Sequence, residues 1–259
     1  MAKDFQHLKF RIDERVARIT FARPPLNVFN IAMMREVGDA LSECVPQRDL
    51  AAIVFAAAPD TRAFSAGVAV EEHVADTVFQ MLEAFHSIFR GLRQIAKPVI
   101  AVVDGPALGG GCELVAACDI VIASERARFG QPEIKLGVFP PVAAILLPRI
   151  IGEKRARELI LTGDLIDAGE ALQLGLVNYV VPSAEVEQKT ESVLGKLREL
   201  SASSLAMTRA ALDLGGQNSF ESALEDVENL YLHELMKTED AQEGSRAFME
   251  KRKPEWRNK

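Results

Sequence analysis

Residues that could do chemistry lie next to three consecutive glycines, Gly109 to Gly111. An apolar segment from Cys112 to Ala117 follows at once, and this pattern predicts a loop that opens into a short buried helix. The start of a helix leaves backbone N–H groups without intrahelical partners, and glycine lets the backbone approach a ligand closely. We therefore expect a backbone site here that favours negative charge, with Glu113 in the first turn of the helix beside it.

A second carboxylate, Glu133, follows the apolar, strand-like run from Asp119 to Ser124 and lies in the sequence FGQPEI. A carboxylate in apolar surroundings is costly unless it is paired or protonated. Taken singly, Glu113 is also explained as a first-turn glutamate favoured by the helix dipole, and Glu133 as an ordinary loop residue. Taken together, two carboxylates beside an anion-stabilising backbone suit proton transfer next to a carbonyl group.

Several motifs, in a characteristic order and spacing, resemble the crotonase (enoyl-CoA hydratase/isomerase) superfamily. They are ALGGGCEL at 107–114, FGQPEIKLG at 129–137 and FSAGV at 64–68, with further matches at 161–164, 168–177 and 250–256. The resemblance implies an α/β fold: a crotonase-type spiral of repeated β-β-α turns that carries the active site over residues 1–182, and a C-terminal helical oligomerisation region over residues 183–259. It also implies a carbon–oxygen lyase that adds water to an unsaturated acyl-CoA thioester.

The resemblance assigns roles residue by residue. Two backbone N–H groups, those of Val68 and Gly110, are expected to bind the thioester oxygen as it becomes an enolate. Glu133 matches the general acid that protonates carbon, and Glu113 matches the group that orients and deprotonates water. Isomerases and decarboxylases of the superfamily usually retain one of these glutamates or replace both, so the pair favours hydration or its reverse. Lys251 matches a lysine that a neighbouring subunit brings toward the CoA nucleotide, and a solvated basic tail explains it equally well.

A long helix is predicted over residues 71–95, because apolar residues recur there at helical spacing from Val74 to Ile95. Core packing explains most of this stripe. The resemblance places the helix beside the acyl pocket, so the candidates for substrate contact are Ala66, Met81, Phe85, His86 and Phe89. A purely structural His86 is the alternative, because histidine is often partly buried without a catalytic role.

One segment departs from the family pattern. After the matched Leu136-Gly137, ordinary enoyl-CoA hydratases carry a proline and a glycine-rich turn, whereas this chain has VFPPVAA at 138–144. Pro141 replaces a flexible glycine and removes a backbone donor, and Phe139 makes the segment more apolar. Neutral loop drift is one explanation, and a pocket remade for another acyl group is the other. Together with PPLNVFN at 24–30, the segment is similar to the cyclohexa-1,5-diene-1-carbonyl-CoA hydratases of anaerobic aromatic (benzoyl-CoA) degradation.

The elements that must position these residues follow from apolar periodicity. A β-hairpin is expected over 8–21, a helix over 31–45 and buried strands over 50–57, 98–103 and 120–123. After residue 182 the sequence becomes charged and amphipathic, and it predicts four helices at 184–200, 205–214, 220–237 and 241–251. The resemblance implies that the apolar faces of these helices build a homotrimer or a dimer of trimers.

Composition argues against several other classes of function. A net charge of −7 and a pI of about 5.3 disfavour nucleic acid as the main partner. The three cysteines lack metal-site spacing and indicate buried thiols in a reducing compartment. No dinucleotide-binding fingerprint or P-loop lysine accompanies the glycines. We expect no metal and no cofactor, with CoA entering as part of the substrate, and a cytoplasmic location, because the first residues resemble neither a signal peptide nor a membrane span.

Two rival functions stay open. The enzymatic rival is an ordinary short-chain enoyl-CoA hydratase or isomerase of fatty-acid or amino-acid breakdown. The rival of another class is a non-catalytic or RNA-binding crotonase homologue, against which the acidic balance and the two glutamates both count.

Overall fold

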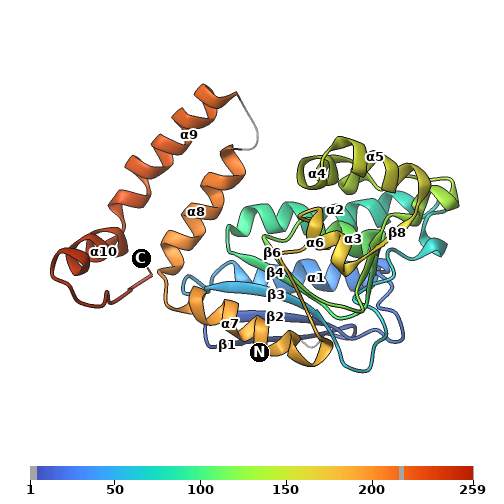
Figure 1. Ribbon diagram of the computed structural model, residues 1–259, viewed down its shortest axis with the longest axis horizontal. Coiled ribbons are helices and arrows are strands. Elements are labelled where there is room, and N and C mark those ends of the chain that lie inside the picture. Colours follow the sequence, from blue (N-terminus) through green and yellow to red (C-terminus); the bar gives the residue numbers. More distant parts are fainter. Residues whose placement is uncertain (1–4, 216–218, 259) are drawn as a thin grey trace.

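A six-stranded sheet forms the centre of the protein in the computed structural model, which describes residues 5–215 and 219–258 (Figure 1). In spatial order its strands are β1 (Leu8–Asp13), β2 (Val16–Phe21), β3 (Ala52–Ala57), β4 (Val99–Val103), β6 (Ile120–Ser124) and β9 (Tyr179–Val181). The β1–β2 hairpin is antiparallel, and every later pair in this sheet is parallel. The predicted hairpin and the three predicted buried strands are confirmed.

A smaller sheet gives the fold its spiral character. It consists of β5 (Pro106–Leu108), β7 (Arg128–Gly130) and β8 (Leu165–Asp167). One turn of the chain runs through β4, β5 and the helix α3 (Gly110–Ala116), and the next runs through β6, β7 and the helix α4 (Pro141–Ile151). This is the predicted repeat of β-β-α turns, and it brings the starts of successive helices to the same end of the molecule.

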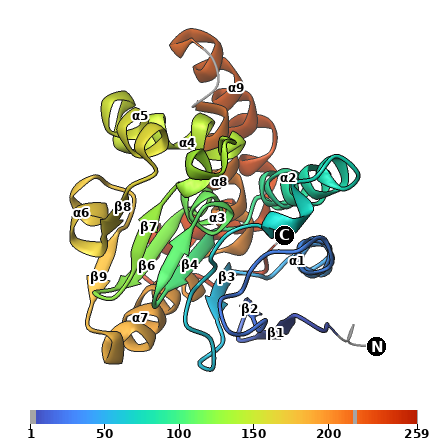
Figure 2. The ribbon, with the colours of Figure 1, turned by 90° about the vertical axis from the view of Figure 1, so that its right-hand side faces the viewer.

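Helices cover both faces of the large sheet. Alternate residues of a strand point to opposite sides, so an apolar strand presents two faces that need cover. In β3, Ile53 and Phe55 join the core under α1 (Ile31–Cys44) and α2 (Val78–Ile95), whereas Ala52 and Val54 pack with α7 (Val186–Arg198). Figures 1 and 2 show α1 and α2 on one side of the sheet and α7 on the other. Coverage on both faces explains why this strand is an almost unbroken apolar run.

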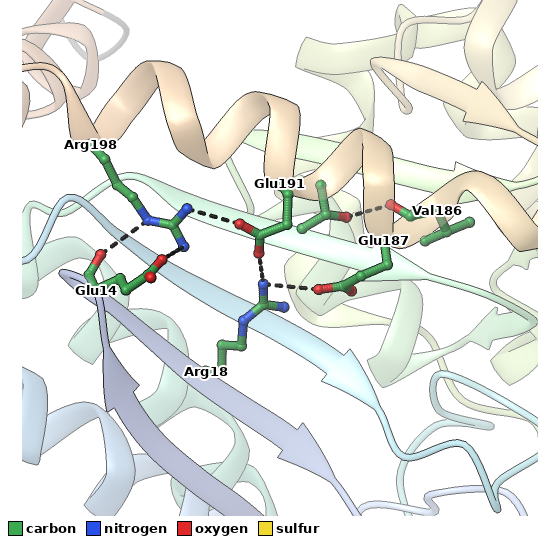
Figure 3. Close-up of polar contacts among 7 residues, drawn as sticks. Glu14, Arg18, Val186, Glu187, Glu191 and Arg198 are labelled. Carbon is green, nitrogen blue, oxygen red and sulfur yellow. Dashed lines mark hydrogen bonds and ion pairs between the residues drawn. The ribbon is translucent and has the colours of Figure 1, made fainter.

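Ion pairs also tie α7 to the hairpin (Figure 3). Arg18 of β2 pairs with Glu187 at 3.1 Å and with Glu191, and Arg198 pairs with Glu191 at 2.8 Å and with Glu14 at 3.4 Å. The first helix of the predicted C-terminal helical region therefore packs on the sheet, within the body of the protein.

The remaining three helices leave the sheet as an arm (Figure 1). They are α8 (Ala202–Gly215), α9 (Phe220–His233) and α10 (Glu239–Met249), so all four predicted C-terminal helices are confirmed. Arg209 anchors the arm: its side chain donates to Asp119 at 2.8 Å and to the Leu92 carbonyl at 2.9 Å. Large apolar side chains are exposed along the arm, namely Leu212, Phe220, Leu224, Tyr231, Leu232, Met236, Phe248 and Met249.

The prediction of one helix over residues 71–95 is wrong at its start. The chain first makes a 3-10 turn, η1 (Val70–Glu72), and α2 begins only at Val78. Val74 is 54% exposed and takes no part in the apolar stripe. The Glu72 carboxylate accepts the Ile31 N–H at the start of α1, at 2.9 and 3.1 Å, and this bond holds the turn away from a continuous helical path.

Three helices, α4, α5 (Glu153–Thr162) and α6 (Ala168–Gln173), were not predicted from the sequence pattern. Proline is a favoured first residue of a helix, so Pro141 begins α4 instead of stiffening a loop. Pro148 lies inside the same helix, and both prolines mask its helical character in the sequence. Within the described ranges, the structure has no helix that is both long and apolar enough to span a lipid bilayer.

Candidate active site

A cavity of about 330 Å³ lies beside the glycine loop and collects most of the predicted site residues. The predicted residues that line it are Ala66, Val68, Met81, Phe85, Gly110, Glu113, Glu133, Phe139 and Pro141. Other lining residues, which the sequence reasoning did not single out, are mainly apolar: Val70, Leu82, Leu136, Val138 and Pro140. The fold thus brings both carboxylates and both predicted backbone donors to one largely apolar cavity.

Val68 and Gly110 both line this cavity and lie close to each other. Phe29 donates its N–H to the Gly67 carbonyl at 2.8 Å and accepts the Ala69 N–H at 2.9 Å. Because successive N–H groups of an extended segment point to opposite sides, the Val68 N–H points away from Phe29. Gly110 lies next to this segment, since a Cβ on Gly110 would stand 2.9 Å from Val68 Cγ2.

Gly110 is also the first residue of α3, so its N–H has no partner inside the helix. The preceding Gly109 must be glycine for two reasons. Its φ is +51°, and a Cβ there would stand 2.7 Å from Glu133 Oε1. The close approach of this backbone places the Glu133 carboxylate directly against the loop that carries the Gly110 donor.

Glu113 is almost fully buried, with 2% of its surface exposed. Its Oε1 accepts the N–H groups of Val142 and Ala143, each at 2.8 Å. These residues follow Pro141 in the first turn of α4, where free N–H groups favour a negative charge. Burial outweighs these bonds and, together with the charge of Glu133, raises the pKa of Glu113 to about 7. The carboxyl group can therefore exchange its proton near neutral pH.

Glu133 lies on the short 3-10 helix η2 (Pro132–Leu136) and is half-buried. Burial raises the pKa of this carboxyl group as well. Gln131 is completely buried beside it, and its amide nitrogen, when turned toward Glu133, donates to both carboxylate oxygens at 3.3 Å. Gln131 was not predicted from the sequence. The available signal was a polar residue two positions before a candidate acid, in an apolar stretch.

His73 is a second missed residue of the cavity wall. Its Nδ1 lies 2.9 Å from the carbonyl oxygen of Ala69. The erroneous extension of the α2 helix to residue 71 hid His73, because it placed this residue within a regular helix. A histidine five positions after a candidate oxyanion donor was the signal that could have revealed it.

Three predicted residues lie outside the cavity lining. Phe89 packs edge-to-face against Phe85, with ring centroids 5.0 Å apart, and so supports the wall from behind. His86 has a buried Nε2 without a hydrogen-bond partner in the described structure, and burial together with Arg90 lowers its pKa. Lys251 is exposed beyond the end of α10, on the arm. Among the described residues there is no group of three or more His, Cys, Asp or Glu side chains that could hold a metal ion.

Comparisons with known proteins relate the whole chain to one family. The family described as Enoyl-CoA hydratase/isomerase matches residues 11–259. The probable enoyl-CoA hydratase echA8 of Mycobacterium tuberculosis is 39% identical over 251 residues, which cover 94% of this chain and 95% of that protein. The cyclohexa-1,5-dienecarbonyl-CoA hydratase of Thauera aromatica is 36% identical over 249 residues, 95% of each chain. A crystal structure of enoyl-CoA hydratase from Mycobacterium smegmatis superposes with a TM-score of 0.91 at 32% identity, covering 97% of this chain and 99% of that one.

The raised pKa of Glu113 predicts a pH-dependent cost to stability. The folded protein binds this proton more tightly than the unfolded chain, so the carboxyl costs nothing below its unfolded pKa of about 4.5 and destabilises the fold increasingly as the pH rises to about 7. Glu113→Gln keeps an acceptor for the two N–H groups but carries no charge. The substitution should therefore stabilise the protein more at pH 8 than at pH 4.5. The two changes in the free energy of unfolding should differ by on the order of 3 kcal/mol.

Urea unfolding of both proteins at the two pH values measures this difference. The exposed Glu125 provides the control, because Glu125→Gln should leave the pH dependence as in the wild type. An equal effect of Glu113→Gln at both pH values would show that the carboxyl is not desolvated in the folded protein.

Proposed function

The chain belongs to the enoyl-CoA hydratase/isomerase family, and from that premise we propose that its substrate is cyclohexa-1,5-diene-1-carbonyl-CoA, a cyclic dienoyl thioester of anaerobic aromatic degradation. The broader assignment is a hydro-lyase of the enoyl-CoA hydratase type. The observation that carries the proposal is that Glu113, Glu133, Val68 and Gly110 all line one cavity.

The two N–H groups are proposed to bind the thioester oxygen. Negative charge grows on this oxygen as the substrate becomes enolate-like, so donors fixed in advance stabilise the transition state more than the ground state. Gly110 supplies an N–H with no intrahelical partner, and the Val68 N–H points away from its neighbouring Phe29 segment. Rigid main-chain donors need little reorganisation during the reaction.

The two carboxyl groups are proposed to move the protons. Burial raises the pKa of both carboxyl groups, and the pKa of about 7 lets Glu113 exchange a proton near neutral pH. Glu113 accepts a proton from water as the hydroxyl oxygen bonds to carbon, and Glu133 delivers its own proton to the neighbouring carbon. Two contacts support these roles: α4 fixes one oxygen of Glu113, and Glu133 lies against the loop of the Gly110 donor. Exchange with solvent restores the starting protonation state.

The choice of acyl group rests on the segment from Leu136 to Pro141. It forms an apolar edge of the cavity, and Phe139 is 68% exposed there. Pro141 has no N–H to offer to the attacking water, so we assign the water to the two carboxyl groups. The Thauera relative, named for its cyclic substrate, supports the proposal. The generic hydratase name of the Mycobacterium tuberculosis relative favours a second candidate, a short-chain enoyl-CoA hydratase.

Direct comparison of two thioesters tests the proposed substrate. We expect kcat/KM for hydration of cyclohexa-1,5-diene-1-carbonyl-CoA to exceed that for crotonyl-CoA by at least about tenfold, since one well-matched apolar contact already discriminates by this factor. A preference for crotonyl-CoA would assign the protein to the short-chain hydratases. Hydration of neither thioester, combined with salt-dependent binding of RNA, would favour the non-catalytic rival.

Each glutamate should be necessary for turnover. Glu113→Gln and Glu133→Gln keep the side-chain shape but remove the titrating group, so each should lower kcat by at least about 10²-fold. Thioester binding, measured by calorimetry with a saturated acyl-CoA, should stay close to wild type. Glu125→Gln serves as the matched control, because this exposed glutamate lies outside the cavity. Near wild-type rates for both variants would contradict the two-glutamate mechanism, and loss in only one would indicate a single-acid enzyme.

The exposed arm should be covered in an assembly. We propose a homotrimer or a dimer of trimers built through the apolar side chains of α8, α9 and α10, because a monomeric protein rarely exposes so much contiguous apolar surface. In this assembly, Lys251 of one subunit lies near the CoA nucleotide of its neighbour. Light scattering at micromolar concentration should give the mass of three or six chains. A stable monomer under those conditions would contradict the assembly.

A further inference from the structure

We infer that His73 is a positioning residue that holds the Val68 oxyanion donor in place through its Nδ1–H. The inference rests on the proposed function for the role of Val68. His73 lies on the cavity wall, half-buried, between η1 and the start of α2.

The imidazole makes a defined contact with the residue after Val68. Nδ1 of His73 lies 2.9 Å from the Ala69 carbonyl oxygen. A carbonyl oxygen can only accept, so Nδ1 carries the proton and donates. The same carbonyl accepts the N–H of Glu72 at 3.1 Å, which uses both of its lone pairs. His73 therefore closes the η1 turn back onto the segment that carries the Val68 donor.

That segment is fixed from two sides. On the side of the sheet, Phe29 bonds to the Gly67 carbonyl and to the Ala69 N–H. The turn beyond it is docked by the Glu72 carboxylate on the Ile31 N–H. The His73 ring connects these two anchors, because it joins the residue that follows η1 to the carbonyl of Ala69. Without this bond, the Ala69–Val70 peptide has one restraint fewer against rotation, and Ala69 links this peptide directly to Val68.

Such a rotation matters because an oxyanion donor works only near its productive position. A displacement of a fraction of an ångström or of 10–20° already weakens a catalytic contact of this kind. The Val68 N–H must converge with that of Gly110, which the rigid start of α3 holds. Loss of the His73 bond should therefore weaken binding of the transition state more than binding of the ground state.

Two amide substitutions separate this role from a direct contact with substrate. His73→Asn places its amide nitrogen near the position of Nδ1 and can still donate to Ala69. His73→Gln places its amide nitrogen near the position of Nε2 and cannot. The two side chains are both neutral and polar, so they change the polarity of the cavity in the same way.

Thr77→Val is the matched control for loosening of the same segment. The Thr77 hydroxyl donates to the Glu72 carbonyl at 2.9 Å, so this nearly isosteric change also removes one side-chain bond to the main chain. Thr77 does not line the cavity, and its bond does not reach the peptide that follows Val68. Turnover of Thr77→Val should equal that of the wild type.

We expect His73→Gln to lower kcat by about 3- to 10-fold with KM changed less than about 2-fold, as loss of one hydrogen bond predicts. His73→Asn should remain within about 2-fold of the wild type. A wild-type rate for His73→Gln, or a loss in His73→Asn that equals or exceeds the loss in His73→Gln, would overturn the inference. The latter result would indicate that Nε2 contacts the substrate instead.

Binding of two acyl-CoA probes provides a readout that needs no turnover. Acetoacetyl-CoA forms an enolate readily, whereas butyryl-CoA resembles only the ground state. His73→Gln should weaken acetoacetyl-CoA by about 3- to 10-fold and leave butyryl-CoA unchanged, and equal weakening of both would overturn the inference. If the wild-type enzyme hydrates no thioester, the proposed function fails. The ratio of the affinities for acetoacetyl-CoA and butyryl-CoA still tests the position of the Val68 donor in that case. Melting temperatures of the variants identify any general loss of folding.

Discussion

The desolvation of the Glu113 carboxyl group is the constraint on which the catalytic end of the molecule depends. A buried carboxyl without partners would be too costly, so the fold places the first N–H groups of α4 on one of its oxygens. This requirement fixes where α4 begins, and it ties α4 to α3, which carries Glu113. Burial still prevails and raises the pKa of Glu113 to about 7. A group that were fully stabilised as an anion would exchange its proton less readily near neutral pH.

Much of the fold could be predicted because its main elements leave local signals. The strands under α1 and α2 are continuous apolar runs, and the glycine triplet marks the close approach of the backbone to Glu133. The start of α2 was mispredicted, because helical spacing continues through Val74 although the Glu72 carboxylate is bonded to a distant helix start. No local pattern reports such a bond. The helix α4 was not predicted because its local sequence is misleading: it contains two prolines, which are typical of loops.

In the candidate site, too, some residues leave a local signal in the sequence and others depend on tertiary contacts. Glu113 and Glu133 stand out because each is a carboxylate in a distinctive stretch, and the fold brings both to one cavity. His73 and Gln131 act through contacts with a carbonyl and a carboxylate, and such contacts depend on the tertiary path of the chain. His86 lies outside the cavity lining although it shares α2 with Met81 and Phe85, which the rotation of the helix directs into the cavity.

The arm comes last in the sequence, and this order bears on how a newly made chain escapes aggregation. Every strand of the large sheet, and the helix α7 that covers its second face, precedes residue 200. During synthesis from the N-terminus, the body of the protein can thus close its own core before the apolar arm leaves the ribosome. The exposed apolar surface of the arm emerges only after the body, when a folded body already limits the encounters that this surface can make.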